Sequence, residues 1–217
     1  MKHHIVGVLA GCVLALALFT GAAAQVETAF EKAADSGDYA TAMRLARPLA
    51  EHGDKAGENI VGLLYFFGWG VPRDYSQAAF WYRKAADQGV QAAQNNLGTL
   101  YRSGRGVPKD PAQAMFWFRK SATTGASESY LNLGQMYKNG EGVPRDDKQA
   151  VIWFRGAADG GLPGGQYELG RMYEDGRGVG RDYAQAAKWY RRAAEGLFRE
   201  TDKQQDPAPS KAAPSAP

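Results

Sequence analysis

This sequence is organised around the stretch Leu97–Asp110, which reads LGTLYRSGRGVPKD. Its pattern of a Gly, a Tyr, a Gly-x-Gly-Val turn and an Asp occurs four times, in strict register at a step of 36 residues. A fixed period of this size is typical of proteins built from stacked structural repeats. The step is clearest in two quartets: Gly62, Gly98, Gly134 and Gly170, and Trp81, Trp117, Trp153 and Trp189.

Each repeat has the pattern of two helices joined by a glycine-rich turn. In the second copy, apolar residues at helical spacing predict a first helix over residues 92–103. Gly98 has no Cβ, so we expect the partner helix to approach closely there. Gly104 follows the helix end, where a left-handed residue closes the last turn. Asp110 is followed three residues later by Gln113, the spacing of a capping box at the start of a second helix.

The pattern LG-x-x-Y-x-x-G-x-GV-x-x-D-x-x-x-A-x-x-W resembles the Sel1-like repeat family, whose members are relatives of the tetratricopeptide repeat. The resemblance covers residues 54–197, most of the chain. It implies an all-α fold, a right-handed α-solenoid of helix-turn-helix repeats, which serves protein–protein interaction and is often an adaptor. In that family the repeat residues are structural and mark no active site. We therefore expect the recurring Trp, Tyr, Gly and Asp residues to be scaffold.

The sequence divides into a leader, an opening unit, four repeats and a tail. The opening unit keeps the 36-residue register, since Asp38 and Ala42 precede Asp74 and Ala78, but its turn is shorter, as in a tetratricopeptide repeat. Atypical terminal repeats commonly cap a stack. The predicted ranges are 1–24 for a signal peptide, 25–53 for a degenerate capping unit, 54–89, 90–125, 126–161 and 162–197 for the repeats, and 198–217 for a disordered Pro/Ala-rich tail.

Residues 1–24 have the features of a cleavable secretory signal: a basic start, an apolar run and three alanines before Gln25. Two alternatives stay open. The apolar run is about long enough for a transmembrane anchor, and the residues up to Cys12 resemble a bacterial lipobox, which would place a lipid on Cys12. The apolar core before Cys12 is short, which favours ordinary cleavage. Cleavage would leave no cysteine and no membrane span, and we expect a periplasmic or secreted protein.

The sequence offers little for catalysis. His52 is the only histidine after residue 24, and it stands at a predicted helix end. The chain has no H-E-x-x-H, Cys/His cluster, Walker loop or nucleophile elbow. We therefore expect no catalytic, cofactor-binding or metal-binding residues. The net charge of +3 is too balanced to suggest nucleic acid as a partner.

In a stack of repeats, the positions that vary between copies carry specificity. On the predicted first helices, the non-core positions hold amides and charged side chains, which can hydrogen-bond an extended peptide. A plain solvated face is the alternative. The candidate partner-binding residues of this polar row are Asn96, Arg102, Asn132, Lys138 and Arg171.

The first full repeat departs most from the pattern. Phe66, Phe67 and Trp69 stand where the other repeats have polar residues. One interpretation is that the opening unit packs over these aromatic side chains. The other is that they form the floor of an apolar pocket at the N-terminal end of the concave face, which takes a hydrophobic anchor of a partner.

We therefore expect a non-catalytic exported adaptor that binds a protein or peptide partner in the bacterial cell envelope. The aromatic side chains could instead stack on sugars, which would make the protein a scaffold associated with peptidoglycan or another polysaccharide. A third alternative is a β-lactam or cell-wall hydrolase of the cysteine-rich Sel1-like type. The chain lacks those cysteines and the S-x-x-K and K-T-G motifs, which disfavours that alternative.

Overall fold

The computed structural model describes residues 31–205, with side chains described up to Phe198. The predicted signal segment, including Cys12, and the end of the predicted tail lie outside the described residues. Within the described range every regular element is helical and no strand is present. Residues 31–35 are helical, and they are followed by α3 (Tyr39–Glu51), α4 (Lys55–Phe67), α5 (Tyr75–Asp87), α6 (Gln91–Ser103), α7 (Pro111–Ala122), α8 (Ser127–Asn139), α9 (Asp147–Asp159), α10 (Pro163–Asp175) and α11 (Tyr183–Gln205).

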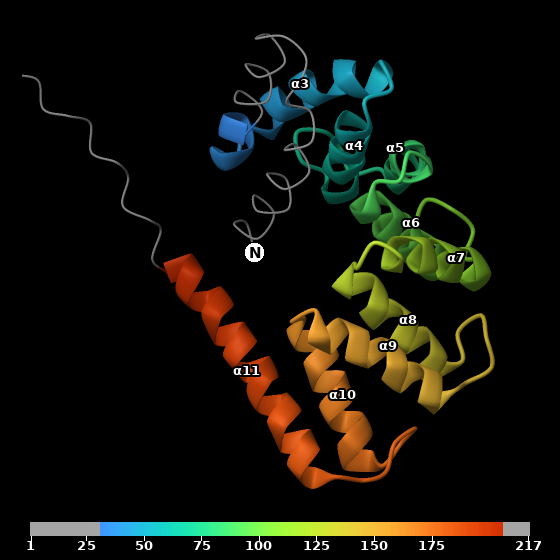
Figure 1. Ribbon diagram of the computed structural model, residues 1–217. Helices are drawn as coiled ribbons and strands as arrows, with labels where there is room; N and C mark the ends of the chain where they lie inside the picture. Colours follow the sequence, from blue (N-terminus) through green and yellow to red (C-terminus); the bar gives the residue numbers. More distant parts are fainter. Residues whose placement is uncertain (1–30, 206–217) are drawn as a thin grey trace, which may run out of the picture.

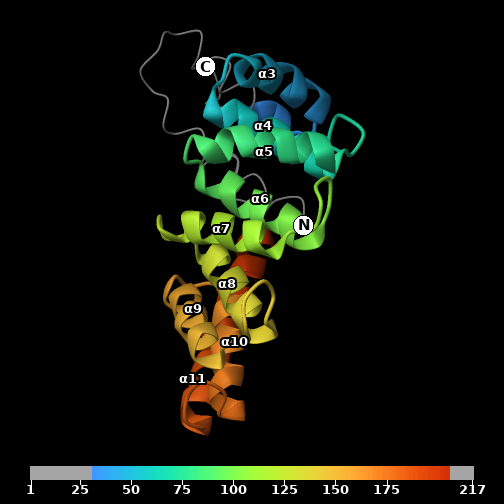
Figure 2. The same ribbon diagram turned by 90° about the vertical axis from the view of Figure 1, so that its right-hand side faces the viewer.

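The helices pack in the order of the chain. The first helices of the four repeats are α4, α6, α8 and α10, and the second helices are α5, α7, α9 and α11. Each helix from α3 onwards contacts the next, and α4 also contacts α6 as α8 contacts α10. In Figure 1 the helices follow a curved path from α3 to α11, and Figure 2 shows them in successive layers. The structure confirms the predicted fold, an all-α solenoid of helix-turn-helix repeats.

Aspartates begin the second helices, as predicted. In α7, Oδ1 of Asp110 accepts hydrogen bonds from the backbone N–H groups of Ala112 and Gln113, each at 3.0 Å. The reciprocal half of the predicted capping box is absent. The Asp110 N–H donates instead to the Tyr101 carbonyl oxygen at 2.9 Å. The full capping box was a wrong prediction, because the last turn of α6 already supplies an acceptor for that N–H group.

The two helices of a repeat cross closely at the repeat glycine. A Cβ on Gly98 would lie 2.7 Å from Cε1 of Phe118, closer than real side chains approach. The predicted close approach is confirmed, and an aromatic ring of the second helix occupies the space beside the glycine. The equivalent pairs are Gly62 with Tyr82, Gly134 with Phe154 and Gly170 with Tyr190.

The second glycine of each turn joins one repeat to the repeat before it. Gly106 has a φ of 70° and lies against the carbonyl group of Tyr75, the first residue of α5. A Cβ at this position would overlap that carbonyl, and the left-handed backbone itself favours glycine. The equivalent contacts join Gly70 to Tyr39, Gly142 to Pro111 and Gly178 to Asp147. The recurrence of this glycine was visible in the sequence, but its contact with the neighbouring repeat was not.

The recurring tryptophans belong to the core, as the scaffold interpretation requires. Trp81, Trp117 and Trp189 are buried. Trp153 is half-buried, and its ring stacks on Tyr130 with 5.8 Å between the centroids. Small alanines beside them are also buried, which leaves room for the large rings.

The last helix is longer than the repeat requires. α11 continues to Gln205, whereas a disordered tail was predicted from residue 198. Residues 198–205 contain neither glycine nor proline, so nothing in their sequence interrupts the helix. Pro207 follows, and proline disfavours helical backbone at the residue before it.

Gly98→Val is expected to destabilise the protein, because the branched side chain would overlap the Phe118 ring. Overpacking of this kind typically costs about 1–3 kcal/mol. Gly180→Val is the control, since Gly180 is exposed and a Cβ there meets nothing within 4 Å. Urea denaturation measures the free energy of unfolding of both variants. Equal stabilities would show that the two helices do not cross closely at Gly98.

Candidate functional site

Much of the polar row joins neighbouring repeats instead of facing solvent. Arg102, near the end of α6, donates from Nε to Glu141 Oε2 at 2.6 Å and from Nη1 to Gln135 Oε1 at 2.9 Å. Lys138 on α8 pairs with Glu168 on α10 at 2.9 Å. All these side chains are half-buried. Two of the three cations of the row, Arg102 and Lys138, therefore hold the stack together.

The amides and the last arginine of the polar row differ in their surroundings. Asn132 Nδ2 donates to Asn95 Oδ1 at 3.1 Å, which is again a contact between repeats. Asn96 is half-buried. Arg171 is exposed and belongs to no ion pair among residues 31–198. The structure thus leaves Arg171 accessible, while Asn132 is largely engaged within the protein.

The contact between Arg102 and Glu141 keeps the Glu141 carboxyl in its ionised form. The hydrogen bonds from Arg102 hold the pKa of the Glu141 carboxyl below its usual value, against the opposing effect of partial burial. Glu141 is therefore ionised at neutral pH and balances the Arg102 guanidinium.

Trp69 is covered by the opening unit. Its ring stacks between Tyr39 of α3, at 4.7 Å between centroids, and Phe67, at 4.4 Å, each with an interplanar angle of 16°. Phe67 remains 41% exposed on the outer side of this stack. For Trp69 the geometry matches the interpretation in which the opening unit packs over the aromatic side chains.

The Trp69 contact has equivalents further along the stack. In three of the four turns, the residue between the two glycines meets the first residue of the second helix in the repeat before it, and in the other turn Glu141 pairs with Arg102 instead. The Arg105 guanidinium lies 5.5 Å from the centroid of the Tyr75 ring, and Arg177 pairs with Asp147 at 2.8 Å. The same place in the stack thus holds ring stacking, a cation–π contact or an ion pair.

Phe66 borders a groove between the first and second full repeats, which we call the Phe66 groove. Its ring meets the Tyr75 ring edge-on, with 5.4 Å between centroids. Phe66 stands where the next repeats have Arg102 and Lys138, and it has no polar group that could reach the following repeat. The groove has a volume of about 460 Å³ and is lined by Phe66, Thr99, Arg102, Ser103, Arg105, Lys109 and Glu141.

The Phe66 groove is cationic. Its lining holds three cations and a single carboxylate, Glu141, which is already paired with Arg102. Among residues 31–198, neither Arg105 nor Lys109 forms an ion pair. Arg73 lies beside the groove, 5.4 Å from the centroid of the Tyr75 ring. Sequence reasoning identified Phe66 and Arg102 but missed Arg105 and Lys109, which stand in the turn and not on the first helix.

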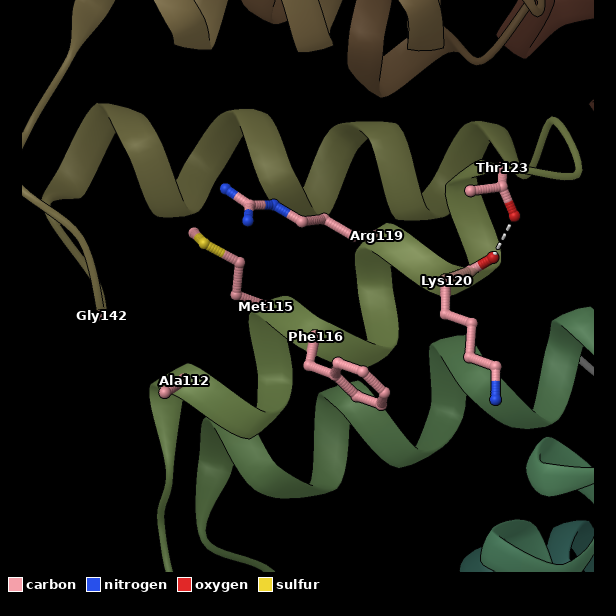
Figure 3. A pocket seen from close by; sticks show the side chains of 7 residues that line it. All are labelled: Ala112, Met115, Phe116, Arg119, Lys120, Thr123 and Gly142. Carbon is pink, nitrogen blue, oxygen red and sulfur yellow. Dashed lines mark hydrogen bonds between the residues drawn. The ribbon is translucent and has the colours of Figure 1, made fainter.

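A second hollow lies against α7, on the second-helix side (Figure 3). Its volume is about 590 Å³, and Phe116 projects beside it with 53% of its surface exposed. Phe80 and Ile152 occupy the same position in the neighbouring repeats and are equally exposed, at 53% and 58%. Sequence reasoning missed this apolar row, although its 36-residue spacing is visible in the sequence. The hollow is lined by Ala112, Met115, Phe116, Arg119, Lys120, Thr123 and Gly142.

The described residues contain no group of three or more His, Cys, Asp or Glu side chains placed to hold a metal ion. His52 lies at the end of α3, and its Nδ1 is 2.7 Å from the Pro48 carbonyl oxygen. From residue 31 to residue 205, none of the helices combines the length and the hydropathy that a membrane span requires.

These features define a class of protein: a helical repeat solenoid whose recurring residues build the stack and whose variable residues line its surface. The chain belongs to the Sel1 repeat family, because the model of the Sel1 repeat matches residues 56–90, 91–125, 127–162 and 163–196. The resemblance inferred from the repeat pattern is confirmed. Proteins of this family are typically scaffolds without catalytic activity, and the fold is consistent with protein–protein interaction.

Solved structures share this architecture. A protective antigen present in uropathogenic Escherichia coli strains, which displays an SLR fold, is 40% identical over 76% of this chain, with a TM-score of 0.70. This chain spans only 36% of the length of that antigen. A Sel1 repeat protein from Oxalobacter formigenes is 32% identical over 79% of this chain and 69% of its own, with a TM-score of 0.73.

A more distant structure shares the fold alone. The immunity protein Pa5087 from Pseudomonas aeruginosa is 22% identical over 81% of this chain and 67% of its own, with a TM-score of 0.55. None of the curated protein sequences compared with this chain matches it.

Glu141→Gln is expected to lower stability at neutral pH but not in acid. The pKa of Glu141 is lowered in the folded state, so its pairing with Arg102 stabilises the fold above the unfolded pKa of about 4.3. That contribution is lost as the pH falls through the folded pKa. We expect a loss of about 1 kcal/mol at pH 7, which shrinks toward zero near pH 3. Urea denaturation at both pH values measures it.

Glu195→Gln serves as the matched control, because Glu195 is exposed and belongs to no ion pair among residues 31–198. The control should behave like the unmodified protein at both pH values. A loss for Glu141→Gln that is the same at pH 3 and pH 7 would contradict the assigned charge pair.

Trp69→Ala is expected to loosen the opening unit. Removal of the ring leaves Tyr39 without its stacking partner, and loss of a part-buried aromatic ring should cost about 2–3 kcal/mol. Hydrogen exchange should rise first in α3, while α8 to α11 stay protected. Phe67→Ala, on the exposed side of the same stack, should have a smaller effect. Unchanged exchange in α3 would show that Trp69 does not anchor the opening unit.

Proposed function

We propose that this protein is a non-catalytic scaffold of the bacterial cell envelope that holds a protein or peptide partner on the first-helix face of its solenoid. One observation supports the choice of face. At the Phe66 groove, variable side chains from three consecutive repeats line one open concavity. Further along this face, Asn132 and Lys138 bond to side chains of the neighbouring repeat.

Two further facts support a scaffold. Sel1 repeat proteins typically act without catalysis. The polar residues of the first-helix face bond to one another between repeats, as expected for positions that maintain the stack. The proposal therefore assigns no catalytic, cofactor or metal site.

Location in the cell envelope is part of the proposal and is supported by the leader. Residues 1–24 carry the basic start, apolar run and alanines of a cleavable signal. Cleavage before Gln25 would release a cysteine-free chain. Mass measurement of the mature N-terminus, together with cell fractionation, tests this part. A lipid on Cys12 would instead anchor the protein to a membrane, and an intact leader in the cytoplasm would contradict export.

Site-specific photocrosslinking in cells tests the binding face. A photoreactive phenylalanine analogue is placed at Ser103, which is exposed and lines the Phe66 groove, or at Phe116, which is exposed on the second-helix side. We expect a discrete protein adduct from position 103 and none from position 116. An adduct only from position 116 would move the binding face. Sedimentation with insoluble peptidoglycan, without any protein adduct, would support the polysaccharide-associated alternative.

A further inference from the structure

The Phe66 groove exists because one step of the stack lacks its usual bridge. Between the second and third repeats Arg102 reaches forward to Gln135 and Glu141, and between the third and fourth Lys138 reaches Glu168. In the first repeat the same position holds Phe66, whose ring turns toward Tyr75. Phe66 therefore makes no polar bridge from α4 to α6, and the groove stays open there. On the second-helix side the same two repeats are still bridged, because Arg83 of α5 donates to the Tyr101 hydroxyl of α6.

The charges at this step favour an anionic ligand. Arg105 and Lys109 are both exposed in the turn after α6, and neither meets a carboxylate within 4 Å in the described part of the chain. Glu141 pairs with Arg102 at 2.6 Å, and the charge of Lys109 also lowers the pKa of its carboxyl, so one carboxylate serves all three cations of the lining. An excess of cations over carboxylates in one groove favours the approach of negative groups.

The groove also has one aromatic side chain in its lining, Phe66. Tyr75 lies outside the lining and supports it, because its ring meets Phe66 edge-on and lies 5.5 Å from the Arg105 guanidinium. A ligand that carries only negative charge would make no use of the apolar surface of Phe66. A ligand with an apolar side chain next to its carboxylates would use both features, since burial of that side chain adds affinity to the charge attraction.

We infer that the Phe66 groove binds an acidic peptide segment of a protein partner, in which an aromatic or large apolar residue is flanked by Asp or Glu. The inference rests on the proposed scaffold function and names the chemistry of its partner. The carboxylates lie against Arg105 and Lys109, and the apolar side chain lies against Phe66.

The test measures binding of a defined probe to the full mature chain. The probe is the peptide Asp-Glu-Phe-Glu-Asp, with a fluorescent dye coupled through a Gly-Ser spacer to its N-terminus and an amide at its C-terminus, and its binding is measured by fluorescence anisotropy at low salt. We expect saturable binding that weakens as ionic strength rises from about 20 mM to about 200 mM, because salt screens exposed charges. Replacement of Phe by Ala in the probe should weaken binding about tenfold.

Charge variants of the protein locate the site. Arg105→Gln combined with Lys109→Gln should weaken probe binding at least about tenfold. Arg181→Gln combined with Lys188→Gln removes the same charge from exposed residues outside the groove and should change binding less than about twofold. Thermal unfolding establishes that both double variants fold. NMR shifts of the backbone amides at Thr99 and Ser103 on titration with the probe provide a second measurement that needs no variant.

Four outcomes would overturn the inference. The probe does not bind, or the two double variants lose the same affinity for it. The amide shifts occur at another surface, or polygalacturonate displaces the probe and the Phe and Ala probes bind equally well. The last would assign the groove to an anionic polysaccharide. The scaffold proposal fails separately. A protein adduct from position 103 without probe binding would support the scaffold proposal and exclude the acidic peptide as its ligand. Probe binding without any protein adduct would support the binding chemistry of the groove and contradict the scaffold proposal.

Discussion

The structure depends on a contact between two backbones. The second glycine of each turn lies against the carbonyl group at the start of the second helix in the preceding repeat, as Gly106 does against Tyr75. Any Cβ would separate the two segments, so this contact sets both the distance and the register between repeats. A side-chain contact between repeats then recurs at a constant separation of 18 residues, from a second-helix arginine to a tyrosine hydroxyl of the next repeat: Arg83 to Tyr101, Arg119 to Tyr137 and Arg155 to Tyr173.

Because the backbone sets the register, the side chains above it can vary in chemistry. At one equivalent position the stack uses ring stacking of Trp69 on Tyr39, a cation–π contact of Arg105 with Tyr75, and an ion pair of Arg177 with Asp147. Each contact stabilises the step where it occurs without altering the spacing of the repeats. Variation between repeats is therefore partly structural, and it does not by itself mark a binding residue.

Stability and recognition compete for the same positions on the first-helix face. A cation that reaches the next repeat, such as Arg102, is saturated by its neighbours and has few donors left for a partner. Where Phe66 replaces that cation, the first helices of the first two repeats lack this polar contact. A groove whose lining holds more cations than carboxylates lies there instead. The residues most open to a partner are thus in the turns, at Arg105 and Lys109, and not along the middle of the helices.

The sequence by itself determined the family, the period, the helix pairs, the Asp caps and the close crossing at Gly98, because these depend on local spacing and on what glycine and aspartate do to a backbone. It also singled out Phe66 as unusual. Only the tertiary structure decided which side chains of the polar row bond to a neighbouring repeat, and that Arg105 and Lys109 line the Phe66 groove. It also decided that Asp110 donates its N–H to Tyr101 and not to Gln113. Those outcomes depend on side chains brought together from different helices and repeats, and the geometry of their packing is not encoded in the spacing within one repeat.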